Sequence, residues 1–179
     1  MEMKRVVITG IGALTPIGNN AEEYWQGLVN GVSGAAPITL FDATNAKTTF
    51  ACEVKNFDGS QYFDRKEIRK YDRFSQFGIV AADQAVQDSG LDLEKIDKDF
   101  AGVIWASGIG GIQTFEEEIT SFVHGDGTLR FSPFFIPKMI ADICAGHISI
   151  KYGFRGPIFC PVSACASSAH ALAESFMYI

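Results

Sequence analysis

IFCPVSACASSAH, residues 158–170, reads as a buried strand, a sharp turn of small residues and the start of a helix. The apolar run 158–162 predicts the strand, and Cys165 stands where the helix begins. This order is typical of a nucleophile elbow, which projects one reactive side chain into a pocket. A helix N-terminus favours thiolate over thiol, and its backbone N–H groups can hold an oxyanion. We therefore expect Cys165 to be a catalytic nucleophile.

Strand and helix patterns alternate in the sequence upstream of this elbow. The best-defined helix follows Asp72, because apolar and small residues recur at helical spacing from Phe74 to Val86 and Gly90 ends the run. The order implies an α/β fold with a mixed, largely parallel sheet covered by helices. We expect strands at 5–10, 48–54, 101–107 and 158–162, and helices after Asn20, after Asp64, over 72–90, over 113–123, from Pro137 to about Tyr152, and from about Cys165 onward.

Composition limits the classes of function. The chain has 179 residues, a formal net charge of −6, 47% hydrophobic and 20% charged residues, which is typical of one ordinary globular domain. An acidic balance gives no reason to expect nucleic acid as a partner. No apolar run approaches the ~18 residues of a membrane-spanning helix, and the N-terminus lacks a secretory signal. We therefore expect a cytoplasmic protein that does not bind membranes.

Three further cysteines and two glycine clusters are not expected to take part in catalysis or cofactor binding. Cys52, Cys144 and Cys160 lie in apolar patterns, so we expect them to be small buried hydrophobic residues with free thiols. Cysteine and histidine spacings match no metal site, so none is expected. The glycines at 10 and 12, and at 108 and 110, follow strands but lack the third glycine of a dinucleotide fingerprint. They are better interpreted as tight turns.

A basic cluster stands out in this acidic chain. Its members are Arg65, Lys66, Arg69, Lys70 and Arg73. One interpretation is a solvated helix face. The other is a docking surface that steers an acidic partner by its charge.

The last helix, 166–179, is apolar nearly all round and lacks a C-cap or polar tail. One explanation is that the last helix is packed in the interior of the protein and ends there. We favour the alternative, in which residues 1–179 are the front part of a longer protein.

Several motifs together carry a family resemblance that extends over essentially the whole chain. They are VVITGIGALTPIG, DRKEIRKYDRFSQFG, AADQAVQDSGL, ASGIGGIQTFEE, SPFFIPKMI, AGHISIKYGFRGP and SACASSAHA. The chain resembles the 3-oxoacyl-[acyl-carrier-protein] synthases, the elongating condensing enzymes of fatty-acid synthesis. The resemblance implies a thiolase-like fold of two similar halves, usually a homodimer. Residues 1–179 would then be an N-terminal β-ketoacyl synthase domain that is incomplete, with the second half absent.

The resemblance also implies roles for individual residues. Cys165 matches the cysteine that takes the acyl group from acyl carrier protein, before a carbanion formed by decarboxylation of malonyl carrier protein attacks it. Ile109 and Phe135 match positions that line the acyl pocket. Lys66, Arg69 and Lys70 match the carrier-docking positions. No cofactor is implied, because phosphopantetheine arrives on the carrier protein.

The catalytic histidine pair of the family, and its lysine, have no match here. We expect His124 on the surface and His147 in a core or capping role. His170 lies about 140° round the helix from Cys165 and cannot face the thiol. None of the three is expected to be a catalytic base.

Other functions remain open. A polyketide ketosynthase or a thiolase would share the fold. A chain-length-factor-like partner subunit would not be catalytic, but such subunits characteristically lack the cysteine. A purely structural fragment is the remaining alternative.

Overall fold

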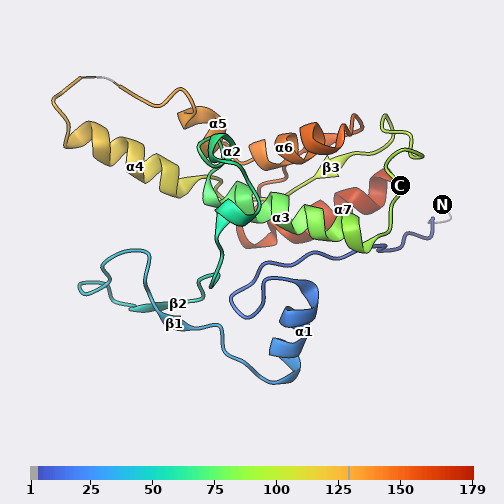
Figure 1. Cartoon of the computed structure of the whole chain (residues 1–179), viewed down its shortest axis with the longest axis horizontal. Helices are drawn as coiled ribbons and strands as arrows, with labels where there is room; N and C mark the ends of the chain where they lie inside the picture. Colours follow the sequence, from blue (N-terminus) through green and yellow to red (C-terminus); the bar gives the residue numbers. More distant parts are fainter. Residues whose placement is uncertain (1–3, 129) are drawn as a thin grey trace.

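The computed structural model describes residues 4–128 and 130–179 (Figure 1). Its strands are only two residues long, so helices dominate the architecture. The helices are α1 (Ala21–Val29), α2 (Arg65–Ile68), α3 (Arg73–Asp88), α4 (Ile112–Val123), α5 (Phe135–Met139), α6 (Ile143–Tyr152) and α7 (Ser167–Tyr178). The strands are β1 (Ala36–Pro37), β2 (Phe50–Ala51), β3 (Val103–Ile104) and β4 (Ile158–Phe159), and two 3-10 turns are η1 (Gly59–Gln61) and η2 (Ala164–Ala166).

Parallel pairing of β3 with β4 forms the sheet that leads to the elbow. Val103 stands opposite Ile158, and the Val103 N–H donates to the Pro157 carbonyl at 2.8 Å. The chain between them contains α4, α5 and α6, so this is a crossover connection, as parallel strands require. A second pair, β1 with β2, is antiparallel. The α/β class is confirmed, with a smaller sheet among the described residues than the sequence predicts.

The predicted strand at 5–10 is wrong for this structure. Residues 4–14 run without strand pairing alongside α3. Side chains of that helix take the place of a neighbouring strand: the Ile11 N–H donates to Asp88 Oδ2 and the Ala13 N–H to Gln84 Oε1, both at 2.9 Å. The β-branched pattern indicates an extended backbone, but pairing depends on which segment lies beside it.

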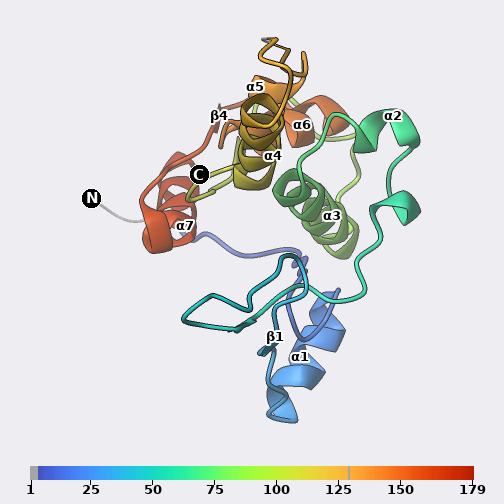
Figure 2. The same cartoon turned by 90° about the vertical axis from the view of Figure 1, so that its left-hand side faces the viewer.

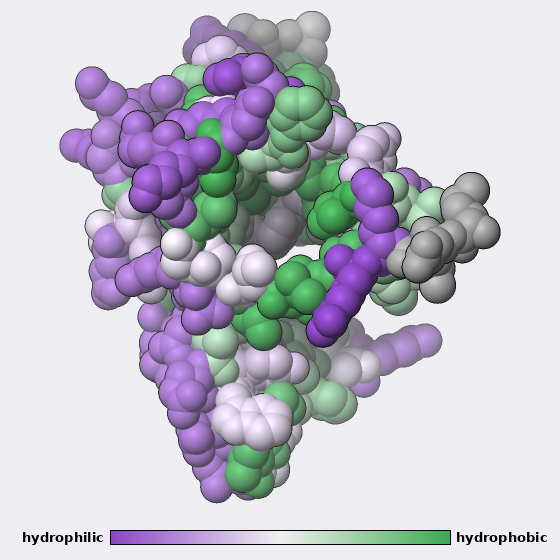
Figure 3. All heavy atoms as spheres, turned by 90° about the vertical axis from the view of Figure 1, so that its right-hand side faces the viewer, coloured by the Kyte–Doolittle hydropathy of each residue, from purple (hydrophilic) through white to green (hydrophobic). Residues whose placement is uncertain are grey.

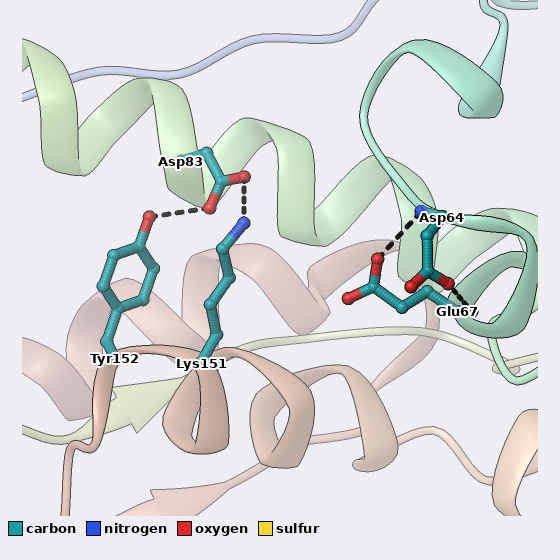
Figure 4. Close-up of polar contacts among 5 residues, drawn as sticks. All are labelled: Asp64, Glu67, Asp83, Lys151 and Tyr152. Atoms are coloured by element: carbon teal, nitrogen blue, oxygen red, sulfur yellow. Dashed lines mark hydrogen bonds and ion pairs between the residues drawn. The ribbon is translucent and has the colours of Figure 1, made fainter.

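Helices α3 and α6 form the centre of the core. Cys144 and Ala145 of α6 are fully buried against Ile79 and Val80 of α3. Polar contacts join the same two helices at the surface, where Asp83 accepts hydrogen bonds from Tyr152 Oη and Lys151 Nζ (Figure 4). The buried positions of α3 follow the apolar stripe only in part, because Ser75, Ile79 and Val80 are more buried than most of its members.

The predicted helix starts are confirmed at three caps. Asn20, Asp64 and Asp72 each accept a hydrogen bond from a backbone N–H in the first turn. At α2 the Glu67 side chain also accepts from the Asp64 N–H, which completes a capping box (Figure 4). Sequence thus locates these helix starts correctly.

The predicted continuous helix from Pro137 to Tyr152 is instead two helices. Pro137 lies in the first turn of α5, where its missing N–H is tolerated. Ile140 is extended at ψ 139°, and α6 begins at Ile143. The Met139 carbonyl accepts from the Gly111 N–H at 2.9 Å, a bond to a distant loop that replaces a helical one.

Helix α3 separates two groups of elements (Figures 1 and 2). Helix α1 and the β1–β2 pair lie on one side of α3, and α4, α5 and α6 lie on the other. On the face that carries both chain ends, apolar side chains surround a hollow (Figure 3). There Lys4 Nζ donates to the Ile179 carbonyl at 2.7 Å. Among the described residues, no helix has the length and apolar character to cross a membrane.

Candidate active site

The elbow is built from β4, η2 and α7. Cys165 is the middle residue of η2 and is exposed, and α7 begins two residues later. Ala164, immediately before it, has φ 50°, which places a residue with a side chain in the left-handed region. Such a conformation costs about 1–2 kcal/mol and persists only where surrounding contacts hold it. The structure therefore has the sharp turn that the sequence predicts.

Ser167 holds this turn from the first residue of α7. Its side chain is 3% exposed, and its Oγ accepts from the Ser163 N–H at 2.9 Å while donating to the Ala164 carbonyl at 2.7 Å. The Ala166 N–H donates to the Ser163 carbonyl at 3.0 Å. These bonds fix the backbone on both sides of Ala164, directly before the thiol.

The turn at 107–111 lies against the elbow. A Cβ built on Gly108 would lie 3.6 Å from the Ala164 carbonyl oxygen. Ser107 Oγ accepts from the Gly110 N–H at 2.9 Å and shapes the turn. Ile109, predicted to line an acyl pocket, is at its tip and is 71% exposed. Ile109 therefore lies in a turn next to the elbow, as a pocket residue would. Its side chain faces solvent in this structure.

Phe135, the other predicted pocket residue, lies at the start of α5. Its ring is stacked on Phe131, with centroids 5.5 Å apart, and is tilted against Phe115 at 6.2 Å. The Gly111–Met139 hydrogen bond connects the end of α5 to the turn that carries Ile109. Phe135 is half-buried within this aromatic cluster. Acyl-pocket roles for Ile109 and Phe135 stay predictions.

The remaining cysteines differ in their surroundings. Cys144 is fully buried, and burial raises the pKa of its thiol to about 12. Cys160 is partly buried, which raises its thiol pKa as well. Cys52 is exposed just after β2, so the expectation that it is buried is wrong. The short β2 ends before it, and Cys52 lines an open cavity together with Tyr24 and Leu28 of α1.

The three histidines lie in different surroundings. His124 is the exposed C-cap of α4, as predicted. The His147 ring packs on Tyr71, with centroids 4.5 Å apart, and burial followed by the nearby Lys70 charge lowers the pKa of His147. His170 Nδ1 lies 2.6 Å from Ser163 Oγ, a contact that the sequence analysis missed. Helical periodicity relates His170 to Cys165, but it does not reveal a partner in the preceding turn.

The basic cluster centres on α2. Lys66, Arg69 and Lys70 are exposed there, as is Arg65. Arg73 differs, because it is half-buried with its guanidinium 5.1 Å from the centre of the Phe77 ring. A cleft of about 450 Å³ next to α2 is lined by residues of mixed charge, among them Asp72, Arg73, Glu117 and Lys138. The cationic surface is therefore formed by α2 and its C-terminal end, without Arg73.

A metal centre has no candidate ligands in this part of the chain. Among residues 4–128 and 130–179, no three His, Cys, Asp or Glu side chains gather as a metal site would require.

Comparison with known proteins identifies relatives over the whole chain. The family described as "Beta-ketoacyl synthase, N-terminal domain" matches residues 3–179. A 3-oxoacyl-[acyl-carrier-protein] synthase 2 of Synechocystis sp. is 44% identical over 179 residues, and one of Staphylococcus aureus is 43% identical over 176. These matches cover 100% and 98% of this chain but only 43% and 42% of the relatives. The chain thus spans less than half of their length.

Solved structures show the same fold. The ishigamide ketosynthase/chain length factor matches with a TM-score of 0.86 at 25% identity, over 98% of this chain and 45% of that one. A type II PKS ketosynthase, solved in complex with its acyl-carrier protein and bound to the hexaketide, matches with a TM-score of 0.74 at 29% identity. This second match covers 96% of this chain and 46% of the other. The thiolase-like fold of ketosynthases is therefore the fold of this chain.

Proposed function

The chain belongs to the beta-ketoacyl synthase family, and from that premise we propose that it carries the acyl-accepting cysteine of a 3-oxoacyl-[acyl-carrier-protein] synthase of fatty-acid elongation. The observation that supports this most directly is the exposed Cys165 at a strained turn after a parallel strand. The curated relatives at 43–44% identity are synthases of this kind. The proposed parent enzyme is an acyltransferase.

The first proposed step is acyl transfer to Cys165. Its thiolate attacks the carbonyl carbon of an acyl thioester carried by acyl carrier protein. The carbon–sulfur bond to phosphopantetheine breaks, and that thiolate leaves with the carrier. Backbone N–H groups at the start of α7 are suited to stabilise negative charge on the carbonyl oxygen. No cofactor is needed beyond the phosphopantetheine on the carrier.

Condensation is the second proposed step. Malonyl carrier protein loses carbon dioxide, and the resulting carbanion attacks the acyl carbon on Cys165. A carbon–carbon bond forms, the carbon–sulfur bond to Cys165 breaks, and 3-oxoacyl carrier protein leaves. The resemblance assigns charge stabilisation in this step to a histidine pair and a lysine that His124, His147 and His170 do not match. We therefore expect the 179-residue chain to accept an acyl group without condensing it.

The proposed docking surface for both carrier proteins consists of Lys66, Arg69 and Lys70. Lys66 is exposed on α2, and Arg69 and Lys70 are exposed in the turn that follows it, where positive charge can steer an acidic carrier. We further propose that Ile109 and Phe135 line the acyl pocket once the parent assembles as a homodimer. A cytoplasmic location fits this chemistry.

The test is acyl transfer from carrier protein. The chain is incubated with acyl carrier protein bearing a labelled acyl thioester, and the adduct is located by peptide mass spectrometry. We expect the label on Cys165 and none in Cys165→Ala. Label on Cys52 alone, or no label at all, would contradict the proposal.

A polyketide ketosynthase is the second candidate, because one of the solved relatives described above is a type II PKS ketosynthase. Product analysis of the parent enzyme separates the two functions. A fatty-acid enzyme yields a single 3-oxoacyl product per round. A polyketide enzyme extends an unreduced 3-oxo chain.

A further inference from the structure

The strained backbone before Cys165 depends on contacts from α7. Ala164 has φ 50°, and residues with a side chain rarely hold this conformation without outside support. Ser167 brackets the Ala164 peptide by two hydrogen bonds. Ser167 cannot by itself restrain the side chain of Ser163, the residue from which the turn starts.

His170 supplies that second restraint. Its Nδ1 lies 2.6 Å from Ser163 Oγ, and it follows Ser167 by three residues on α7, so both side chains lie on neighbouring positions of one helix face. A serine hydroxyl both donates and accepts, so the contact forms with either imidazole tautomer. The contact joins Ser163, before Cys165, to His170 of α7, after it. Cys165 therefore lies between two residues whose side chains are in contact.

We infer that His170 is a positioning residue for Cys165, acting through Ser163 rather than touching the thiol. The inference rests on the proposed role of Cys165 as the nucleophile and extends it to residues with no role so far. His170 then holds the side chain of Ser163, while Ser167 holds the backbone of Ser163 and Ala164. Without the Ser163–His170 contact, Ala164 relaxes toward an ordinary conformation and Cys165 moves away from its place at the start of α7.

The experiment measures the reactivity of Cys165 in the 179-residue chain. Iodoacetamide labelling at constant pH, followed by peptide mapping, gives a rate constant for this thiol alone. The variants are His170→Phe, which keeps a ring without the hydrogen bond, Ser163→Ala, and the double variant. His170→Asn is the conservative variant, because its side-chain amide reaches the position of Nδ1. Ser168→Ala is the matched control, an exposed serine in the first turn of α7.

We expect His170→Phe and Ser163→Ala each to slow labelling about five-fold, the effect of one lost neutral hydrogen bond. The double variant should be no slower than either single one, because both remove the same contact. His170→Asn should restore most of the rate, and Ser168→Ala should leave it unchanged. A merely structural role would lower the melting temperature without this rescue pattern.

Two results would overturn the inference. One is a His170→Phe rate equal to that of the unmodified chain and of Ser168→Ala. The other is single-variant effects that multiply in the double variant. Because iodoacetamide needs no carrier protein, this outcome is independent of acyl transfer. Failure of the proposed function would instead appear as an unlabelled Cys165 in the unmodified chain with acyl carrier protein.

Discussion

Asp72 accepts hydrogen bonds from both the backbone N–H and the hydroxyl of Thr114, and so ties the start of α3 to the start of α4. Its other carboxylate oxygen accepts from the Phe74 N–H as the N-cap of α3. Both residues are buried. One carboxylate therefore serves two helices that are separated in the sequence by β3 and the Ile109 turn.

Replacing Asp72 should destabilise the chain more than replacing an ordinary cap. In Asp72→Ala, α3 loses its cap and the buried Thr114 hydroxyl loses its acceptor, so we expect the free energy of unfolding to fall by about 2–4 kcal/mol. Asp64→Ala, at the exposed cap of α2, is the control and should cost about 1 kcal/mol. Urea denaturation measures both. Equal losses would show that the Thr114 contact contributes nothing.

Cysteine reactivity should follow position and burial. Cys165 should react first with limiting iodoacetamide, because it is exposed at a helix N-terminus. Cys144 should react last, because it is fully buried and its thiol pKa of about 12 leaves almost no thiolate at neutral pH. Exposed Cys52 is the internal control for accessibility without activation. Peptide mapping over time gives the order, and uniform labelling would contradict it.

Charge reversal on α2 should weaken binding of the carrier protein. Changing Lys66, Arg69 and Lys70 to Glu should lower affinity at low salt at least about tenfold, mainly through slower association, and reduce the salt dependence. The matched control reverses three exposed lysines elsewhere, Lys47, Lys55 and Lys95, with the same change in net charge. Surface plasmon resonance at several salt concentrations measures both. Equal losses would make the effect one of net charge alone.

Two helical glycines should respond to alanine with opposite signs. A Cβ on Gly78 would lie 2.3 Å from Cys144 Sγ and 2.8 Å from a ring carbon of Trp105, so Gly78→Ala forces α3 away from α6. We expect a loss of about 1–3 kcal/mol from this overpacking. A Cβ on Gly146 meets nothing within 4 Å, so Gly146→Ala should stabilise α6 by about 1 kcal/mol. Thermal unfolding checks both signs.

His147 should make stability depend on pH. Burial lowers its pKa in the folded chain, so the unfolded chain takes up the proton more readily. Stability is therefore fully present above the ordinary histidine pKa of about 6.5 and falls as the pH drops below it toward the lowered folded value. His147→Phe should flatten this slope, whereas exposed His124→Gln should leave it intact. Denaturation at a series of pH values measures the slopes.

Features that depend on residues close together in the sequence were predicted correctly. Features that depend on contacts between distant segments were not. The caps at Asn20, Asp64 and Asp72 follow from residues within one turn of each other. The run 5–10 failed as a strand because its neighbour in space is α3. The helix break at Ile140 escaped prediction because a carbonyl beside it bonds to Gly111, far away in the sequence.

The site divides in the same way. The elbow around Cys165 is predictable because strand, turn and helix are consecutive. The Ser163–His170 contact was missed because periodicity places residues on a helix without saying what lies beside it. Cys52 was assigned to the interior from an apolar pattern, but β2 ends one residue before it and the cavity between Cys52 and α1 is open to solvent.

Pairing of β3 with β4 joins two segments that are far apart in the sequence. Helices α3, α4 and α6 can form from nearby contacts, whereas Val103 meets Ile158 only after the intervening chain has been closed into a loop. The elbow is continuous with β4, so its geometry depends on this late, non-local step. In a chain where β3 has not yet met β4, the strand before the elbow has no partner, and Cys165 is not yet held beside the turn at 107–111. The position of the cysteine therefore depends on a contact with β3, which lies more than fifty residues away from it in the sequence.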